Sequence, residues 1–254
     1  MVEIDAGNTF VKWRKVLSGG SFRYGKFETA RLNNSNGLFS DCYGCAASSD
    51  DVLISSVLSE DQTRKMISLL RQYFLGRIYL ARVVNGLAGV CVAYEKPDSL
   101  GVDRWLVMIA AYRNISHAKG LCVIDAGSAI TADFIAKSGQ HMGGCIMPGR
   151  KLLNSALSIN TQRVRVSEGQ GGVLDFGGST EECVGAGLQH MVLGAMSRLI
   201  SVTNRMRFSH VVITGGDGEA LLSLDSGEAR LLYIPDLVFV GLSNVHELGG
   251  LIEV

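Results

Sequence analysis

The chain has 254 residues, 47% of them hydrophobic, which is enough for one or two domains with buried cores. Basic and acidic residues both number 24 and no basic stretch stands out, so we expect no nucleic-acid partner. The opening residues lack a basic segment followed by a long apolar one, and no run reaches the ~20 apolar residues of a membrane span. We therefore expect a cytoplasmic protein without membrane contact.

Hydrophobic periodicity predicts the elements of the first half of the chain. Strands are expected over residues 2–16 and 22–28, 52–57 and 77–84, and helices over 61–73 and 103–112. The second half repeats this order. Strands are expected over 121–125, 130–135, 141–147 and 210–214, and helices over 149–157, 180–202, 217–224 and after Pro235-Asp236. Strands followed by strand–helix alternation in each half predict an α/β fold with mixed sheets. The expected halves are residues 1–115 and 116–254.

One segment occurs twice: Ile4-Asp5-Ala6-Gly7-Asn8-Thr9 returns as Ile124-Asp125-Ala126-Gly127-Ser128-Ala129. Each copy ends one apolar run and opens another, so each predicts a strand, a tight turn and a second strand. Glycine lets the backbone approach a phosphate closely, and an aspartate there can hold a cation or water. Asp-x-Gly is a common turn, and a single copy could be coincidence. Two copies in matched contexts favour two homologous halves facing one nucleotide, as in the actin, hexokinase and sugar-kinase superfold.

A third element of this kind lies at residues 211–218, where an apolar strand runs into Gly215-Gly216 and then a helix. Paired glycines at a strand end leave a flat gap in which a purine or ribose can lie. Alone, the pattern favours an ordinary strand–turn–helix connection. After two Asp-x-Gly hairpins, it favours an adenosine site.

The segment Gly101-Val102-Asp103-Arg104 lies at a predicted helix start. An aspartate there can be a simple cap. Phosphoryl transfer also needs a carboxylate near the acceptor hydroxyl and a cation near the transferred group, and Asp103 and Arg104 supply both. The residues alone leave these two interpretations open.

Cys42 and Cys45 have the spacing of a metal or redox motif, but no second ligand pair accompanies them. We interpret them as reduced thiols without a role, in a loop that matches no known feature.

The chain resembles type III pantothenate kinases over nearly its whole length. The resemblance is carried by these segments: Asp5–Thr9, Tyr94, Gly101–Trp105, Asp125–Thr131, Gly143–Gly149, Ser179-Thr180, Thr214–Asp217 and Pro235–Leu242. It implies two duplicated ribonuclease H-like or actin-like domains, with mixed sheets flanked by helices and a nucleotide cleft between them.

The resemblance also implies residue roles. ATP would be bound by Asp5, Ala6, Gly7, Asn8, Thr9, Phe10, Val11, Lys12, Ser128, Gly215 and Gly216. Pantothenate would be bound by Tyr94, Gly101, Val102, Asp103, Arg104 and Thr180, with Asp103 as the general base. Asp125 would hold a potassium or ammonium ion, and Asp5 would hold Mg²⁺ through water. Ser128 stands where the family usually has threonine, which keeps the hydroxyl.

The implied activity is ATP-dependent phosphorylation of pantothenate to 4′-phosphopantothenate, the first step of coenzyme A biosynthesis, by a homodimer. An apolar helix such as Met191 to Ile200 could form the dimer interface or simply be a core helix. A rival reading is a non-catalytic regulatory homologue that acts as a transcription accessory factor, and a third is a kinase for another small hydroxyl compound. The presence of Asp5, Asp103 and Asp125 favours an enzyme over the regulatory homologue.

Overall fold

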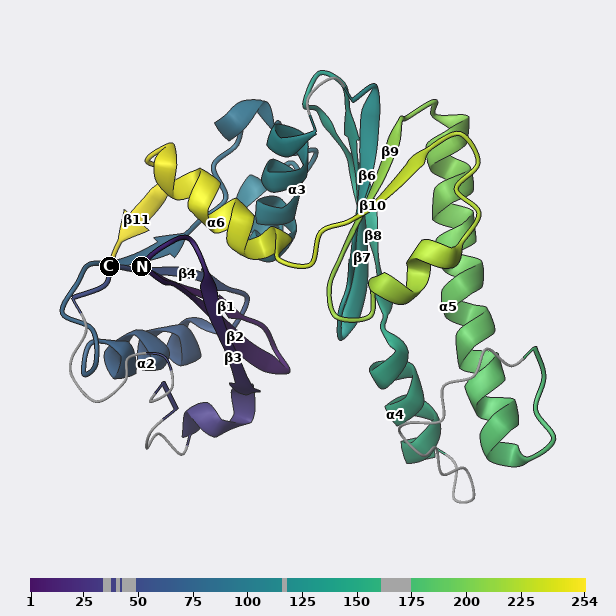
Figure 1. The fold of residues 1–254 in the computed structure, drawn as a ribbon, viewed down its shortest axis with the longest axis horizontal. Helices are drawn as coiled ribbons and strands as arrows, with labels where there is room; N and C mark the ends of the chain where they lie inside the picture. The colour runs from purple at the N-terminus through teal and green to yellow at the C-terminus, as the bar shows by residue number, and fades with distance from the viewer. Residues whose placement is uncertain (34–37, 40–41, 43–48, 116–117, 161–174) are drawn as a thin grey trace. The chain divides into compact units, whose positions relative to one another are not determined.

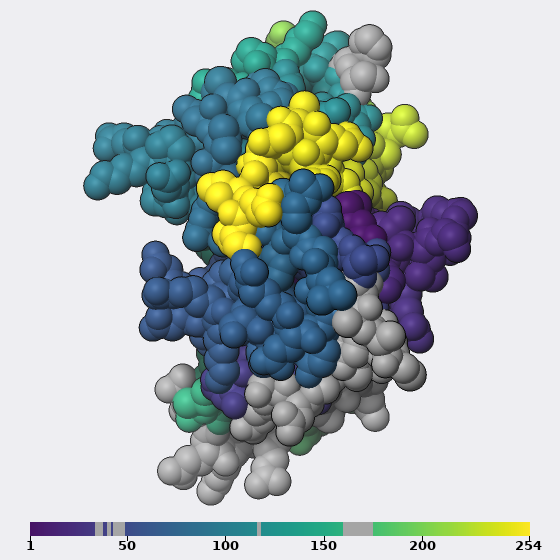
Figure 2. All heavy atoms as spheres, turned by 90° about the vertical axis from the view of Figure 1, so that its left-hand side faces the viewer, coloured from purple at the N-terminus to yellow at the C-terminus, as the bar shows by residue number. Residues whose placement is uncertain are grey.

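The computed structural model describes residues 1–33, 38–39, 42, 49–115, 118–160 and 175–254, which form two compact units. Unit 1 comprises Met1–Asn114 and Asp236–Val254, and unit 2 comprises Ile115–Pro235. Residues 236–254 were expected to belong to the second half. In the structure they return to unit 1, where Figure 2 shows the yellow C-terminal residues against the blue residues of the same unit.

The described part of unit 1 contains one six-stranded sheet with the order β11-β5-β4-β1-β2-β3. Its strands are β1 (Val2–Ala6), β2 (Phe10–Val16), β3 (Phe22–Glu28), β4 (Val52–Ser56), β5 (Ile78–Ala81) and β11 (Leu251–Glu253). Its helices are α2 (Glu60–Leu70), α3 (Val102–Asn114), α6 (Leu237–Glu247) and the 3₁₀ turns η1 (Thr29–Asn33), η2 (Leu87–Gly89) and η3 (Pro97–Ser99).

The two faces of this sheet are covered by different helices. The even residues of β1, Val2, Ile4 and Ala6, belong to a core cluster that includes Met66 and Leu70 of α2. Successive strand side chains point to opposite faces, so Glu3 and Asp5 lie on the other face. Glu3 there accepts a hydrogen bond from Ser243 of α6, which packs beside α3 (Figure 1). Asp5 therefore shares the α6 side of the sheet.

The described part of unit 2 contains a five-stranded sheet with the order β10-β9-β6-β7-β8. Its strands are β6 (Gly120–Ala126), β7 (Ala129–Ala136), β8 (His141–Pro148), β9 (His210–Thr214) and β10 (Arg230–Tyr233). Its helices are α4 (Arg150–Asn160), the long α5 (Thr180–Arg205) and the 3₁₀ turn η4 (Glu219–Ser223). Cys122, Ile124 and Ala126 of β6 pack in a cluster with Met196 and Ile200 of α5.

The two sheets share one topology, which confirms the predicted duplication. The order β5-β4-β1-β2-β3 in unit 1 corresponds strand for strand to β10-β9-β6-β7-β8 in unit 2. Asp5 of β1 lies beside Ser55 of the parallel strand β4, and Asp125 of β6 lies beside Thr214 of the parallel strand β9. The two aspartates thus occupy equivalent places, each at the hairpin end of a central strand.

The predicted elements are present, with differences at short segments. The helix expected over residues 217–224 is the 3₁₀ turn η4, and the short strands β10 and β11 were not predicted. Cys45 lies outside the described residues. Every described cysteine is a free thiol, and burial raises the pKa of both Cys42 and Cys122 to about 12, so these two stay protonated.

Candidate active site

The first Asp-x-Gly segment forms the connection between β1 and β2. The N–H of Gly7 donates to the carbonyl of Phe10 at 3.0 Å, which closes the turn. Thr29, the first residue of η1, makes two hydrogen bonds to this turn. Its Oγ1 donates to the carbonyl of Gly7, and its N–H donates to the carbonyl of Thr9. Asn8 and Thr9 at the tip are exposed. The tip is thus fixed at its base and open to solvent, as a phosphate-binding turn requires.

Lys12 adds a positive charge beside the aspartate of this hairpin. In the antiparallel register of β1 and β2, Lys12 is the direct partner of Asp5, so both side chains lie on the same face. Lys12 is exposed and Asp5 is half-buried. An ammonium beside this turn can contact an anion that the turn binds.

The second Asp-x-Gly segment forms the equivalent hairpin of unit 2, but it is one residue shorter. Ala6 pairs with Val11 across the first turn, whereas Ala126 pairs with Ile130 across the second. Here the N–H of Gly127 donates to the carbonyl of Ala129 at 3.1 Å. The half-buried Ser128 lies in this tighter turn.

Two glycines from other elements pack directly onto the second hairpin. A Cβ on Gly215, which has a φ of +90°, would lie 2.4 Å from the carbonyl oxygen of Ala126 and 2.5 Å from Oδ1 of Asp125. A Cβ on Gly149 would lie 2.3 Å from the carbonyl oxygen of Gly127. Glycine is therefore required at both positions for steric reasons, and the structure brings Gly215 and Asp125 together. Gly216 is exposed and has nothing near its Cβ position.

Asp103 is half-buried in the first turn of α3, and its carboxylate has a defined orientation. Oδ1 accepts a hydrogen bond of 2.7 Å from the N–H of Arg104. Gly101 provides the space for this arrangement, because a Cβ there would lie 2.7 Å from the same Oδ1. The Gly-x-Asp spacing of the sequence thus corresponds to a carboxylate held over a residue without a side chain.

Arg104 and Tyr94 are brought together in unit 1. The guanidinium donates from Nη1 to the Tyr94 hydroxyl at 2.9 Å and lies 5.8 Å from the centre of the tyrosine ring. The Arg104 side chain is almost fully buried, at 5% exposure, although it is charged. The planar N–H donors of a guanidinium match the geometry of the acceptor oxygens of a carboxylate or phosphate.

Thr180 is the first residue of α5 and is exposed. Ser179 is the N-cap: its Oγ accepts from the N–H of Glu182, whose carboxylate accepts in turn from the N–H of Gly178. This reciprocal cap satisfies part of the helix terminus and places two acidic residues, Glu181 and Glu182, in the first turn.

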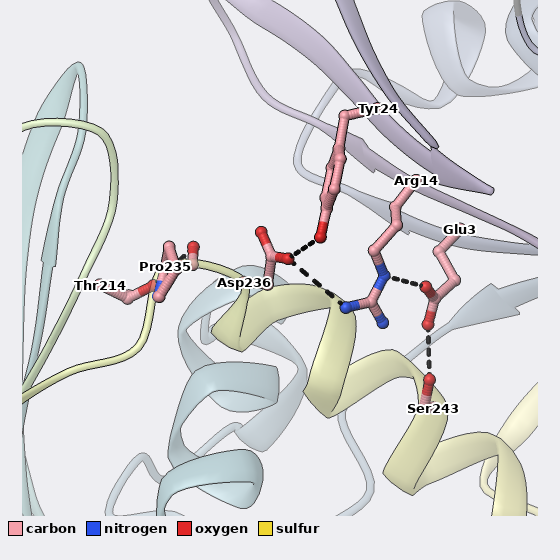
Figure 3. Close-up of polar contacts among 7 residues, drawn as sticks. All are labelled: Glu3, Arg14, Tyr24, Thr214, Pro235, Asp236 and Ser243. Atoms are coloured by element: carbon pink, nitrogen blue, oxygen red, sulfur yellow. Dashed lines mark hydrogen bonds and ion pairs between the residues drawn. The ribbon is translucent and has the colours of Figure 1, made fainter. Parts of the chain in front are cut away.

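A polar network on the α6 side of the first sheet was not predicted from the sequence. It is centred on Glu3 and Arg14 (Figure 3). The fully buried Glu3 accepts from Arg14 Nε and from Ser243 Oγ, both at 2.5 Å. Arg14 also lies 3.7 Å from the carboxylate of Asp236, which accepts from the Tyr24 hydroxyl at 2.5 Å. The network fixes the start of α6 on the face of the sheet that carries Asp5. The sequence gives only a weak signal for this network, because Glu3 and Arg14 are two of several charged residues in strands β1 and β2.

Unit 2 also buries two polar side chains that contact each other within its sheet. Asp133 of β7 and His141 of β8 are both fully buried, and their side chains lie 3.0 Å apart. Among the described residues, no group of three or more His, Cys, Asp or Glu side chains is placed to hold a metal ion. In the same residues, no helix is long and apolar enough to cross a membrane.

Comparisons with known proteins place the chain in a family and agree with this fold. The family model of type III pantothenate kinases matches residues 1–202. The type III pantothenate kinase of Hahella chejuensis is 34% identical over 96% of both chains, and that of Ectopseudomonas mendocina is 33% identical over 96% of this chain and 97% of its own.

Solved structures at lower identity share the fold. A Campylobacter jejuni protein described as a Baf family transcriptional activator superposes with a TM-score of 0.58 at 21% identity, over 98% of this chain and 99% of its own. MreB 5 of Spiroplasma citri bound to AMPPNP superposes with a TM-score of 0.52 at 10% identity, over 97% of this chain and 96% of its own. The predicted actin-like, sugar-kinase-like fold class is confirmed.

Proposed function

The chain belongs to the type III pantothenate kinase family, and from that premise we propose that it transfers the γ-phosphoryl group of ATP to pantothenate, the first step of coenzyme A biosynthesis. The observation that carries this proposal is the set of three carboxylates in matched positions: Asp5 and Asp125 at equivalent hairpins, and Asp103 oriented at a helix start. The regulatory homologue is the weaker alternative, because the solved structure with a transcriptional name shares only the fold.

In the proposed reaction, Asp103 is the general base. Its carboxylate takes the proton of the primary hydroxyl of pantothenate while that oxygen forms a bond to the γ-phosphorus. The bond from this phosphorus to the oxygen bridging to the β-phosphate then breaks, and ADP leaves. The N–H of Arg104, bonded to Oδ1, fixes the carboxylate and so reduces the cost of reaching this geometry.

The remaining residues bind and orient the two substrates. Asp5 to Lys12 and Ser128 would hold the ATP phosphates, and Gly215-Gly216 would lie against the adenosine. Arg104 and Tyr94 would bind pantothenate as the coupled pair that the structure shows, together with Val102 beside them and Thr180. The buried guanidinium suits the substrate carboxylate better than the N-terminus of α5 does, because Glu181 and Glu182 already place negative charge there.

The residues present fit the two cations that the reaction needs. Beside Asp5 lies Ser55, whose buried Oγ has no hydrogen-bond partner among the described residues, so a further polar group is expected there. At Asp125, the lack of a side chain at Gly215 lets the backbone pack closely against two oxygens, Oδ1 of Asp125 and the carbonyl oxygen of Ala126, which are the kind of ligand that a cation prefers. We assign Mg²⁺, through water, to Asp5, and the monovalent cation to Asp125. Bound there, the cations would offset the negative charge that gathers on the phosphate oxygens.

The activity assay tests this function and its cation requirement together. We expect ATP- and Mg²⁺-dependent formation of phosphopantothenate, measured by a coupled ADP assay, that is strong in potassium or ammonium and weak in sodium or Tris alone. Asp125→Ala should lower the activity, and added potassium should restore little of it. Full activity of the wild type in sodium would refute the cation assignment, and no product from pantothenate in any salt would refute the function.

Thr180→Val should affect pantothenate and leave ATP almost untouched. Valine keeps the shape and removes the hydroxyl, so the pantothenate KM should rise by an amount worth about 1–2 kcal/mol, the value of one hydrogen bond to a charged or polar group. Each substrate is titrated with the other at saturation. Equal changes in both KM values would show that the start of α5 sets the state of the whole site. Unchanged KM values would remove Thr180 from it.

We further propose a cytoplasmic homodimer. The free thiols of the described cysteines suit a reducing compartment. Exposed apolar side chains gather on α4 and α5 of unit 2, among them Leu152, Leu157 and Met191, and a second copy of the chain could cover them. Sedimentation of the protein at several concentrations measures this directly.

A further inference from the structure

Several buried polar side chains in unit 1 have no partner among the described residues. They are Ser55 Oγ on β4, Trp105 Nε1 on α3 and Asn244 Nδ2 on α6. These three elements pack against one another, since α6 contacts both α3 and β4, and α3 contacts β4. Buried polar atoms are nearly always satisfied, by protein or by ordered water. Because they lie on three elements that contact one another, we expect water or another polar group from outside the chain in this region.

Among these three residues, Ser55 is the one that lies beside Asp5 in the sheet. It is 0% exposed and is the register partner of Asp5 on the adjacent parallel strand. Register partners on neighbouring strands are about 4.8 Å apart and point to the same face. The hydroxyl of Ser55 and the carboxylate of Asp5 therefore both lie on the α6 side of the sheet. Ser55 is buried there, and Asp5 is half-buried.

The duplicated topology supplies an internal comparison. In unit 2 the residue that corresponds to Ser55 is Thr214, the register partner of Asp125. Its hydroxyl is used, because Oγ1 donates to the carbonyl of Pro235 at 3.2 Å (Figure 3). Both units thus place a hydroxyl beside the hairpin aspartate. Of these two hydroxyls, that of Ser55 is the one without a hydrogen-bond partner in the described part of the chain.

We propose that Ser55 is a positioning residue for Asp5: its hydroxyl donates, through one buried water, to one oxygen of the Asp5 carboxylate and turns the other oxygen toward the Mg²⁺-bound water. This inference rests on the proposed function, which assigns Mg²⁺ to Asp5. A partner that orients a metal-binding carboxylate reduces the number of geometries the carboxylate can adopt, and loss of such a partner typically weakens metal affinity by tenfold or more.

The inference is tested by binding, without turnover. Calorimetry gives the affinity for AMPPNP in EDTA and in excess Mg²⁺, and the ratio of the two is the Mg²⁺-dependent gain. In Ser55→Ala this gain should fall about tenfold, while the affinity measured in EDTA stays close to that of the wild type. Ser55→Thr, which restores a hydroxyl as in Thr214, should recover most of the gain.

Ser56→Ala is the matched control. Ser56 is the next residue on β4 and points to the opposite face, where its Oγ lies 2.8 Å from Thr63 Oγ1. Removal of the Ser56 hydroxyl should lower the unfolding temperature of the protein. The gain in AMPPNP affinity that Mg²⁺ produces should stay unchanged. Equal loss of the gain in both alanine variants would mean a general loosening of β4 and would overturn the role of Ser55.

Two further outcomes separate this inference from the proposed function. A large gain in the wild type that Ser55→Ala preserves would overturn the role of Ser55 alone and leave Asp5 in place. A wild type with no Mg²⁺-dependent gain would overturn the assignment of Mg²⁺ to Asp5, and the role of Ser55 with it. The pantothenate assay reports separately on the reaction.

Discussion

Asp103→Asn should fold normally, bind ATP normally and turn over at least two orders of magnitude more slowly. The amide cannot accept the proton of the acceptor hydroxyl, and loss of a general base typically costs a factor of 10² to 10⁴. Stopped assays with both substrates saturating measure the turnover number, and calorimetry with AMPPNP measures ATP binding. Near-normal turnover would show that Asp103 acts only as a cap or a binding residue of α3.

Gly101→Ala is a companion variant that keeps Asp103 and moves it. The added Cβ would lie 2.7 Å from Oδ1, and the flexible carboxylate can turn away at little cost to folding. We therefore expect a clear loss of turnover with a nearly unchanged unfolding temperature. If Gly101→Ala keeps full turnover, the orientation recorded between Asp103 and the N–H of Arg104 is not the reactive one.

Gly215→Ala should weaken both the stability of unit 2 and its binding of ATP. A side chain at a φ of +90° costs about 1–3 kcal/mol in backbone strain, and the new Cβ would also collide with Ala126 and Asp125. We expect a lower denaturation midpoint and at least a tenfold weaker affinity for AMPPNP, because the second hairpin must shift.

Gly216→Ala is the control for this change. It adds the same methyl group one residue later, where no atom lies within 4 Å and φ is not positive. Its denaturation midpoint should stay near that of the wild type. A stable Gly215→Ala variant with unchanged ATP affinity would show that the hairpin tolerates displacement and that close packing at this glycine has no function.

Much of the fold could be predicted from the sequence because its signals are local. Alternating and apolar runs specify the strands, and the repeated Asp-x-Gly turns indicate the duplication that the strand orders confirm. The short strands β10 and β11 were missed because three or four residues contain too little periodicity to detect. Their pairing depends on neighbours far away in the chain.

The types of residue in the site could be predicted from the sequence, but the contacts that orient those residues could not. Asp103 could be identified as a cap or a base, yet the reason for Gly101 became visible only from the distance between its Cβ position and the carboxylate. The partnership of Glu3 with Arg14 and Ser243 joins residues up to 240 positions apart. No local pattern encodes such a contact, since it depends on where α6 returns to the sheet.

Because α6 returns to unit 1, the two units cannot complete their folding in the order in which they are synthesised. Unit 2 is one continuous stretch, Ile115–Pro235, whereas unit 1 is completed by Asp236–Val254, which follow unit 2 in the chain. Until the ribosome has released α6, Glu3 lacks its bond from Ser243 and Arg14 lacks Asp236, so the charged pair of the first sheet is uncovered. The first strands to be synthesised are therefore covered only after the whole of unit 2 has been made, when α6 packs on the face that carries Asp5.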